Sequence, residues 1–186
     1  MALNPSVSLN DFLRTAYRRL NVDYPKFYKM DGLCKAVFIA AELMVRQSGP
    51  FPEQTALIFS NRTASYLSDS QHAAAIQAVP ATASPATFVY TLPNIAMGEL
   101  SIRHRLYSEN VFFIFENYFP EFLVSYVDSV LDGGKATDAI SGWTEVTEQR
   151  CDLFLYHVGT TDGILHTHAA VNRLYNEEHE RTDTRA

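Results

Sequence analysis

Residues 111–115, Val-Phe-Phe-Ile-Phe, constrain the fold most, because five consecutive large apolar residues are typical of a β-strand. Side chains alternate along a strand, so Phe112 and Ile114 face one way while Phe113 and Phe115 face the other. A strand that is apolar on both faces needs cover on both faces. The run therefore predicts a sheet, with two alternatives open for this strand: the interior of the sheet, or an interface between chains.

Helical and extended segments alternate around this run. Apolar spacing and capping residues predict helices over residues 9–20, 31–48, 66–78, 95–106 and 120–132, with Ser8 and Asp31 as N-caps and Pro120 in a first turn. We expect extended segments at residues 55–60, 87–90, 111–115, 136–146 and 151–158. The last two are joined by a link too short for a helical crossover, which predicts an antiparallel hairpin. The class is α/β, with a mixed and mostly parallel sheet.

Composition indicates one globular domain, since apolar residues make up 47% and charged residues 19% of the 186 residues. We assign residues 1–170 to this domain and residues 171–186 to a polar, flexible tail. Residues 70–98 contain no Asp, Glu, Lys or Arg. Three prolines interrupt this segment, so it does not suit a membrane span. We expect it to be irregular structure that is buried or covered by a partner.

Charge argues against several classes of partner. The chain has 15 basic and 21 acidic residues, a formal net charge of −6, and no cluster of basic residues. Nucleic acids and anionic membrane surfaces both need a clustered positive face, so neither is an expected partner. The N-terminus lacks the pattern of a signal peptide, and the two cysteines, Cys34 and Cys151, are far apart. A cytoplasmic protein with free thiols is the expectation.

Two groups of residues are candidates for chemistry in their own right. His157, His166 and His168 suggest a metal site, but no Asp, Glu or Cys completes a ligand set at suitable spacing, so we predict no metal and read them as surface histidines. Cys34 is expected to be a packing residue on a helix. Arg150 precedes Cys151 and could lower its thiol pKa, although no histidine is positioned to act with it.

The segment from Ser84 to Phe113, SPATFVYTLPNIAMGELSIRHRLYSENVFF, resembles the part of β-ketoacyl synthases that precedes their active site. Five residues match that family's pattern: Ser84, Pro85, Phe88, Asn94 and Gly98. Residues 26–43 and 55–65 are similar to an early helix and a first strand of such proteins, and residues 131–146 place Gly142 and Glu145 as the family does. The likeness covers residues 25–158. It implies half of a thiolase-like fold, with a five-stranded mixed sheet whose last strand is antiparallel.

The sequence departs from the family at the nucleophile. Ketosynthases place a cysteine at the turn that follows the strand corresponding to residues 111–115, whereas that turn here holds Asn117, with Glu116 as its neighbour. No cysteine lies between Cys34 and Cys151. The family's catalytic histidines come from a second half that the likeness does not cover, so their roles are not carried over. An amide cannot hold the acyl group as a thiolate does.

The resemblance therefore implies a non-catalytic ketosynthase-like protein of fatty-acid, polyketide or pigment-type biosynthesis, without a cofactor. Its expected partner is its own copy, a full-length ketosynthase or an acyl carrier protein. Ketosynthases pair the strand before the nucleophile across a two-fold axis, which makes the predicted interface Val111, Phe112, Phe113, Ile114 and Phe115. Two alternatives stay open: a condensing or acyl-transfer enzyme with a non-standard nucleophile, Cys151 being the candidate, and a module that binds a hydrophobic small molecule.

Overall fold

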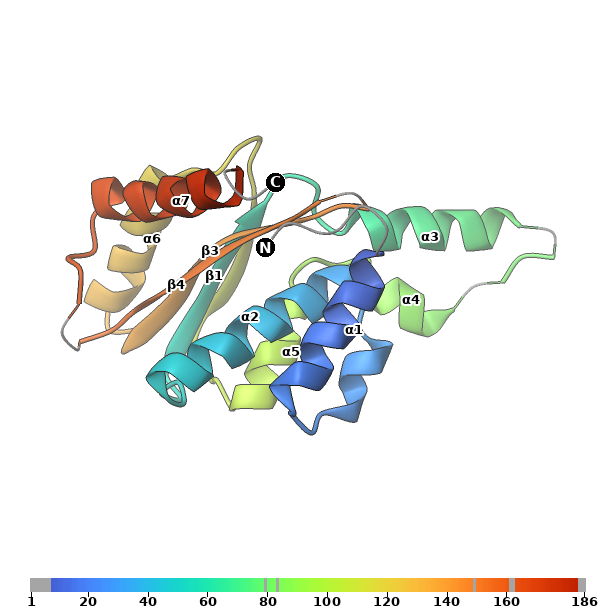
Figure 1. Cartoon of the computed structure of the whole chain (residues 1–186), viewed down its shortest axis with the longest axis horizontal. Coiled ribbons are helices and arrows are strands. Elements are labelled where there is room, and N and C mark those ends of the chain that lie inside the picture. The colour runs from blue at the N-terminus through green and yellow to red at the C-terminus, as the bar shows by residue number, and fades with distance from the viewer. Residues whose placement is uncertain (1–7, 79, 83, 149, 161–162, 184–186) are drawn as a thin grey trace.

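The computed structural model describes residues 8–78, 80–82, 84–148, 150–160 and 163–183, and Figure 1 shows how they form helices around one sheet. The helices are α1 (Leu9–Leu20), the 3-10 helix η1 (Pro25–Lys29), α2 (Gly32–Ser48), α3 (Tyr66–Gln77), α4 (Pro85–Val89), α5 (Ile95–His104), α6 (Pro120–Asp132) and α7 (His168–Asp183). The strands are β1 (Thr55–Asn61), β2 (Asn110–Ile114), β3 (Asp138–Val146) and β4 (Cys151–Val158).

The sheet has the strand order β2-β1-β3-β4. β1 runs parallel to both of its neighbours, with Phe59 opposite Phe112 on one side and Gly142 on the other. β4 runs antiparallel to β3, so the predicted hairpin is confirmed. All seven residues of β1 are buried, as expected for the short apolar run TALIFS. The α/β class and the mixed sheet are therefore as predicted.

Helices cover both faces of the sheet (Figure 1). α1, α2 and α5 pack on one face, where the larger apolar core contains Phe27, Phe38 and Phe59. α6 and α7 lie on the other face, where Ile58 of β1 meets Leu123 and Val127 of α6. Each buried strand thus sends alternate side chains into two separate cores, which is what continuous apolar strands require.

The helix starts follow the capping residues that the sequence indicates. The Ser8 side chain accepts a hydrogen bond from the backbone N–H of Asp11, and the Asp31 carboxylate accepts one from the N–H of Cys34. Pro120 occupies the first turn of α6, where a missing N–H costs nothing. Asp31 also accepts a hydrogen bond from the Ser68 hydroxyl at 2.7 Å, so the same carboxylate ties α2 to α3.

The expectation of five strands is wrong, because the described residues form a four-stranded sheet. Residues 87–90, expected to be extended, lie in and just after the short helix α4. The Ser84 hydroxyl accepts a hydrogen bond from the N–H of Thr87, and Pro85 stands in the first turn. A serine cap followed by proline starts a helix, and this local preference prevails over the apolar character of Phe88 and Val89.

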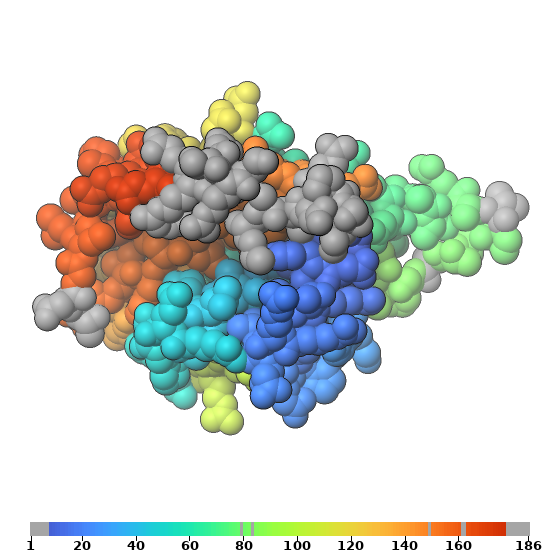
Figure 2. Space-filling view, viewed as in Figure 1, coloured from blue at the N-terminus to red at the C-terminus, as the bar shows by residue number. Residues whose placement is uncertain are grey.

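The uncharged segment of residues 70–98 was expected to be irregular structure, buried or covered by a partner, and it is largely helical and exposed within the chain. Its first part continues α3, its middle contains α4, and its end begins α5. Figures 1 and 2 show α3 and α4 projecting from the body as an arm. Apolar side chains are exposed along this arm, including Ile76, Phe88, Val89 and Leu92. The absence of charge in this segment therefore does not reflect burial within the chain.

β2 lies at an edge of the sheet, so the interior position considered for residues 111–115 is wrong. The predicted alternation of side chains is confirmed: Phe112 packs with the larger core, and Phe113 and Phe115 pack with the core under α6. β1 is the strand that is buried on both faces. Strand order depends on contacts between distant segments, which a local apolar run does not encode.

The C-terminal residues extend the helical structure. α7 runs to Asp183, through most of the segment that the sequence suggested as a polar tail, and residues 184–186 lie outside the described residues. Val171 anchors α7 with 3% exposure. Within the described part of the chain, no helix has the length and apolar character needed to cross a lipid bilayer.

Candidate functional site at the carboxyl ends of the parallel strands

The parallel strands β1, β2 and β3 all end at the same edge of the sheet, where ligands bind in many α/β folds. The turn after β1 begins at Asn61, whose side-chain amide donates to the carbonyl of Ala64 at 2.9 Å and accepts from its N–H at 2.9 Å. These two bonds hold Ala64 at a positive φ of 51°, which is unusual for a residue other than glycine. The turn is therefore fixed by its own asparagine.

Glu145 of β3 fixes the same turn from the neighbouring strand. Its carboxylate oxygen Oε2 accepts hydrogen bonds from the N–H groups of Arg62 and Thr63 at 2.8 and 3.2 Å. Glu145 is buried, and its second oxygen has no partner among the described groups. Glu145, one of the positions that resemble the family pattern, therefore serves the structure. Its carboxylate holds the backbone of the turn that follows β1.

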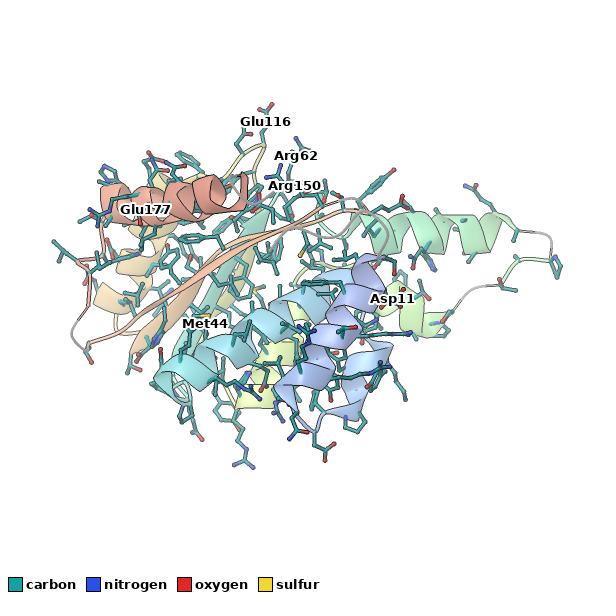
Figure 3. All side chains as sticks on the ribbon, in the orientation of Figure 1. Asp11, Met44, Arg62, Glu116, Arg150 and Glu177 are labelled. Atoms are coloured by element: carbon teal, nitrogen blue, oxygen red, sulfur yellow. The ribbon has the colours of Figure 1, made fainter. Side chains whose placement is uncertain are left out.

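The turn between β2 and α6 contains the residues at the expected nucleophile position. Glu116 and Asn117 are both exposed, and Figure 3 shows Glu116 at the tip of this turn. No hydrogen bond of the described residues fixes the Asn117 side chain. The turn therefore presents an amide and a carboxylate to solvent, and neither group is activated by a neighbouring base.

The two cysteines lie elsewhere and are poorly suited to nucleophilic chemistry. Cys34 is buried on α2, and burial raises its thiol pKa well above the usual value, with Asp31 adding to the rise. Cys151 begins β4, and burial raises its pKa to about 11, with Asp152 adding to the rise. Arg150 pairs with Asp152 at 3.0 Å and does not lower the thiol pKa. Both thiols are therefore protonated near neutral pH.

The five residues that match the ketosynthase pattern lie on the arm and at the start of α5. Ser84 and Pro85 start α4, Phe88 is 57% exposed, and Asn94 precedes α5 without a side-chain capping bond. Gly98 lies within α5, where a Cβ would meet nothing within 4 Å. The pattern therefore describes local turns and caps, and its residues do not converge on one site.

Gly142 differs from Gly98 because its backbone needs glycine. Its φ is +150°, and a Cβ at this position would collide with the carbonyl oxygen of Phe154 on β4. The close approach of β3 and β4 explains a glycine in the middle of a buried strand.

An apolar surface surrounds the turn after β2. We call it the aromatic patch, and it consists of Phe113, Phe115, Phe119, Phe122 and Tyr126. Neighbouring rings contact one another, for example Phe113 and Phe122 at 4.9 Å between ring centres. All five are half-buried or exposed. The free edge of β2 and this patch form one continuous apolar border of the molecule.

The histidines are engaged in pairs with carboxylates. His157 lies 3.1 Å from Asp138, and Nδ1 of His166 lies 2.8 Å from Asp128 of α6. In the described part of the chain, no three His, Cys, Asp or Glu side chains are grouped so that they could hold a metal ion.

Two polar groups inside the protein were not anticipated from the sequence. Glu99 of α5 is buried, pairs with Lys26 at 2.8 Å and accepts from the Tyr90 hydroxyl at 3.3 Å, which ties η1, α4 and α5 together. The second group comprises Tyr118, Ser141, Tyr156 and His166, which lie under α6 and α7. Ser141 in a buried apolar strand is the one signal that the sequence offered for it.

Comparison with known proteins gives a likeness of fold. No family model and no curated protein matches the chain. The structure is similar to that of the ishigamide ketosynthase/chain length factor, with a TM-score of 0.53 and 18% identity over 65% of this chain and 36% of that one. A ketosynthase in complex with its chain length factor from Xenorhabdus doucetiae gives a TM-score of 0.49 and 14% sequence identity, over 67% of this chain and 51% of that one.

The likeness is one of fold: the described elements resemble part of the ishigamide ketosynthase/chain length factor structure. The chain spans about a third of the ishigamide structure that it matches, so the likeness concerns one portion of such a protein.

Proposed function

We propose that this chain is a non-catalytic ketosynthase-like protein that associates with a full-length ketosynthase, or with its own copy, in fatty-acid, polyketide or pigment-type biosynthesis. The observation that carries the proposal is the free apolar edge of β2, which leads directly into the turn that holds Glu116 and Asn117. On the ketosynthase resemblance, Asn117 stands at the position of the nucleophile. The fold supports it, as does the pairing of a ketosynthase with a chain length factor in the name of the similar ishigamide structure.

The edge of β2 is suited to pairing with another strand. The N–H of Phe115 bonds to the carbonyl of Asn61, and the carbonyl of Glu109 accepts from the N–H of Leu57. Ladder bonds recur at every second residue, so the N–H groups of Phe112 and Ile114 point away from β1. A long apolar edge with free N–H groups invites pairing or aggregation unless another chain covers it. The aromatic patch beside it adds apolar area to the same border.

Substitutions at Ile114 test whether the outer edge of β2 forms the contact with another chain. Proline at position 114 removes an outward N–H and leaves the β1 ladder intact, whereas valine keeps the N–H. We expect Ile114→Pro to weaken association about tenfold or more in sedimentation experiments, because the lost hydrogen bond is worth roughly 0.5–1.5 kcal/mol and the ring obstructs approach. Ile114→Val should associate like the wild type. Phe113 is unsuitable for this purpose, because its ring packs on Phe122 and Tyr126 within the chain.

Sedimentation of the wild-type protein, alone and with a purified ketosynthase, distinguishes the two proposed partners. Self-association at micromolar concentration supports the homodimer, and a complex formed with a purified full-length ketosynthase supports the heterodimer. A wild-type chain that stays monomeric and binds no ketosynthase would contradict the proposal. Equal association of Ile114→Pro and Ile114→Val would show that β2 is not the contact.

The acyl-transfer alternative makes a different prediction. Incubation with acyl and malonyl carrier proteins should give no condensation product, because both thiols are protonated at neutral pH. Product formation that is lost in Cys151→Ser and retained in Cys34→Ser would establish Cys151 as the nucleophile and overturn the non-catalytic assignment.

A further inference from the structure

Four buried polar atoms gather on the sheet face covered by α6 and α7, and no described group outside this set forms a hydrogen bond with any of them. They are the hydroxyl oxygens of Tyr118, Ser141 and Tyr156 and Nε2 of His166. We call them the polar cluster. Ser141 is fully buried at the middle of β3.

The sheet register and the ring contacts place the members of the cluster together. Ser141 lies directly opposite Tyr156 in the β3–β4 ladder. The ring centre of Tyr156 is 5.7 Å from that of His166, whose other nitrogen, Nδ1, is 2.8 Å from the Asp128 carboxylate. Burial raises the pKa of Tyr118, with the nearby Tyr156 phenol contributing to the rise. The cluster therefore joins residues of β3, β4, the β2–α6 turn and the segment before α7.

Aromatic side chains form the walls around the cluster. Tyr118 lies 6.1 Å from Trp143 and 5.8 Å from Phe154 between ring centres. Tyr175 of α7 covers them, with its ring centre 4.4 Å from that of Tyr118. Apolar walls with a few convergent polar groups are the usual composition of a small-molecule site.

Without a bound partner, the polar cluster lowers the stability of the fold. Each buried polar group that lacks a partner destabilises a protein by about 1–3 kcal/mol, and a phenylalanine would fill the place of either tyrosine ring without that cost. Native proteins retain few such groups, and each one calls for an explanation. Here Ser141 and Tyr156 have only each other, and the Tyr118 hydroxyl and Nε2 of His166 have no partner among the described residues. A molecule that supplies the missing partners explains such a group within aromatic walls.

We propose that Tyr118, Ser141, Tyr156 and His166 form a binding site for a small neutral ligand that carries an amide group and a short apolar chain. This site is separate from the β2 edge, and it does not depend on the proposed association with a ketosynthase. Tyr175 covers it, so the ligand enters when α7 shifts.

The hydrogen-bonding chemistry of the cluster selects a neutral amide. The hydroxyls of Tyr118, Ser141 and Tyr156 are neutral donors that suit a carbonyl oxygen. Nδ1 of His166 is engaged with the Asp128 carboxylate, so Nε2 is the ring nitrogen left to meet an amide group of the ligand. The Asp128 carboxylate disfavours an anion, and burial among aromatic rings without a free carboxylate disfavours a cation. An apolar chain then packs against Trp143 and Phe154.

Trp143 is the single tryptophan of the chain and reports directly on this site. We would titrate the whole protein with hexanamide, hexanoate and hexylamine, which share a chain and differ in charge, and follow tryptophan emission. Hexanamide should give a saturable change, with an apparent Kd at least tenfold lower than those of hexanoate and hexylamine. No change with hexanamide up to its solubility limit would overturn the proposal and leave ordered water as the partner of these groups.

Isosteric variants separate a ligand site from a structural network. Tyr156→Phe and Ser141→Ala should each weaken hexanamide binding at least fivefold while their melting temperature stays close to that of the wild type, because neither hydroxyl has a partner outside the cluster. Tyr126→Phe, in the aromatic patch, is the matched control and should bind like the wild type. Variants that melt well below the wild type, or that bind hexanamide equally well, would show that the hydroxyls serve the fold and would refute the site.

Discussion

Replacing Gly142 by alanine tests the closest backbone approach in the sheet. The residue has a φ of +150°, and a Cβ would collide with the Phe154 carbonyl oxygen, approach its carbon at 2.9 Å and approach Cα of Leu155 at 3.1 Å. All three atoms belong to the backbone of β4, so no side-chain rotation relieves the contact. The β3–β4 ladder has to separate locally, or Gly142 has to adopt another conformation.

The expected loss of stability in Gly142→Ala is the sum of backbone strain and lost ladder hydrogen bonds. Strain at an unfavourable backbone conformation costs about 1–3 kcal/mol. Local separation of β3 and β4 removes one or two ladder hydrogen bonds, each worth about 0.5–1.5 kcal/mol. We expect Gly142→Ala to lower the free energy of unfolding by about 2–5 kcal/mol, a large share of the roughly 5–15 kcal/mol that stabilises a typical domain. The melting temperature should fall by roughly 4–20 °C.

Urea unfolding monitored by circular dichroism measures this change, and Gly98→Ala is the matched control. Gly98 lies within α5, and a Cβ there meets nothing within 4 Å. Alanine in a helix is favoured over glycine by about 0.5–1 kcal/mol, so the same substitution should stabilise at one site and destabilise at the other. A Gly142→Ala variant within about 0.5 kcal/mol of the wild type would refute the reasoning, since that is the usual scatter of substitutions without a mechanism.

Two further predictions concern pH and helix capping. Burial lowers the pKa of His104 below its usual value of 6.5, and Arg103 contributes to the lowering, so the unfolded chain takes up this proton before the folded one does. Stability should therefore fall as pH decreases below about 6.5, and His104→Gln should reduce that dependence between pH 7.5 and 5.5 in urea titrations. Asp31→Ala removes the cap of α2 and the bond to Ser68, and should cost about 1–2 kcal/mol. Asp69→Ala, on the exposed side of α3, serves as its control and should change stability by less than about 0.5 kcal/mol.

The local parts of the fold were predictable from sequence because they depend on neighbouring residues. Ser8, Asp31 and Pro120 start helices as their chemistry requires, and the short link before Cys151 fixes a hairpin. Residues 87–90 are not extended, because the capping signal of Ser84 prevails over the apolar character of Phe88 and Val89. That signal was present in the sequence.

The candidate sites depend on contacts between distant segments, and local patterns do not contain them. The edge position of β2 follows from β1 pairing with β3, about 80 residues away along the chain. The Asp128–His166 contact joins α6 to the segment before α7 across 38 residues. The Tyr118 ring lies against Tyr175 of α7 and not in the aromatic patch, although Tyr118 is adjacent in sequence to Phe119.

The pairing of β1 with β3 affects how the chain folds while the ribosome is still synthesising it. The side-chain hydrogen bond from Ser60 to Gly142 spans 82 residues, so one edge of β1, the strand that is buried on both faces, has no neighbour until those residues have been synthesised. At roughly 5–20 residues per second, the wait lasts on the order of 4–16 s. Pairing across such a separation also slows folding, because the loop has to close first. Nascent chains that expose an unpaired apolar strand for seconds are substrates for chaperones. The yield of this protein on overexpression should therefore rise at low temperature or with co-expressed chaperones.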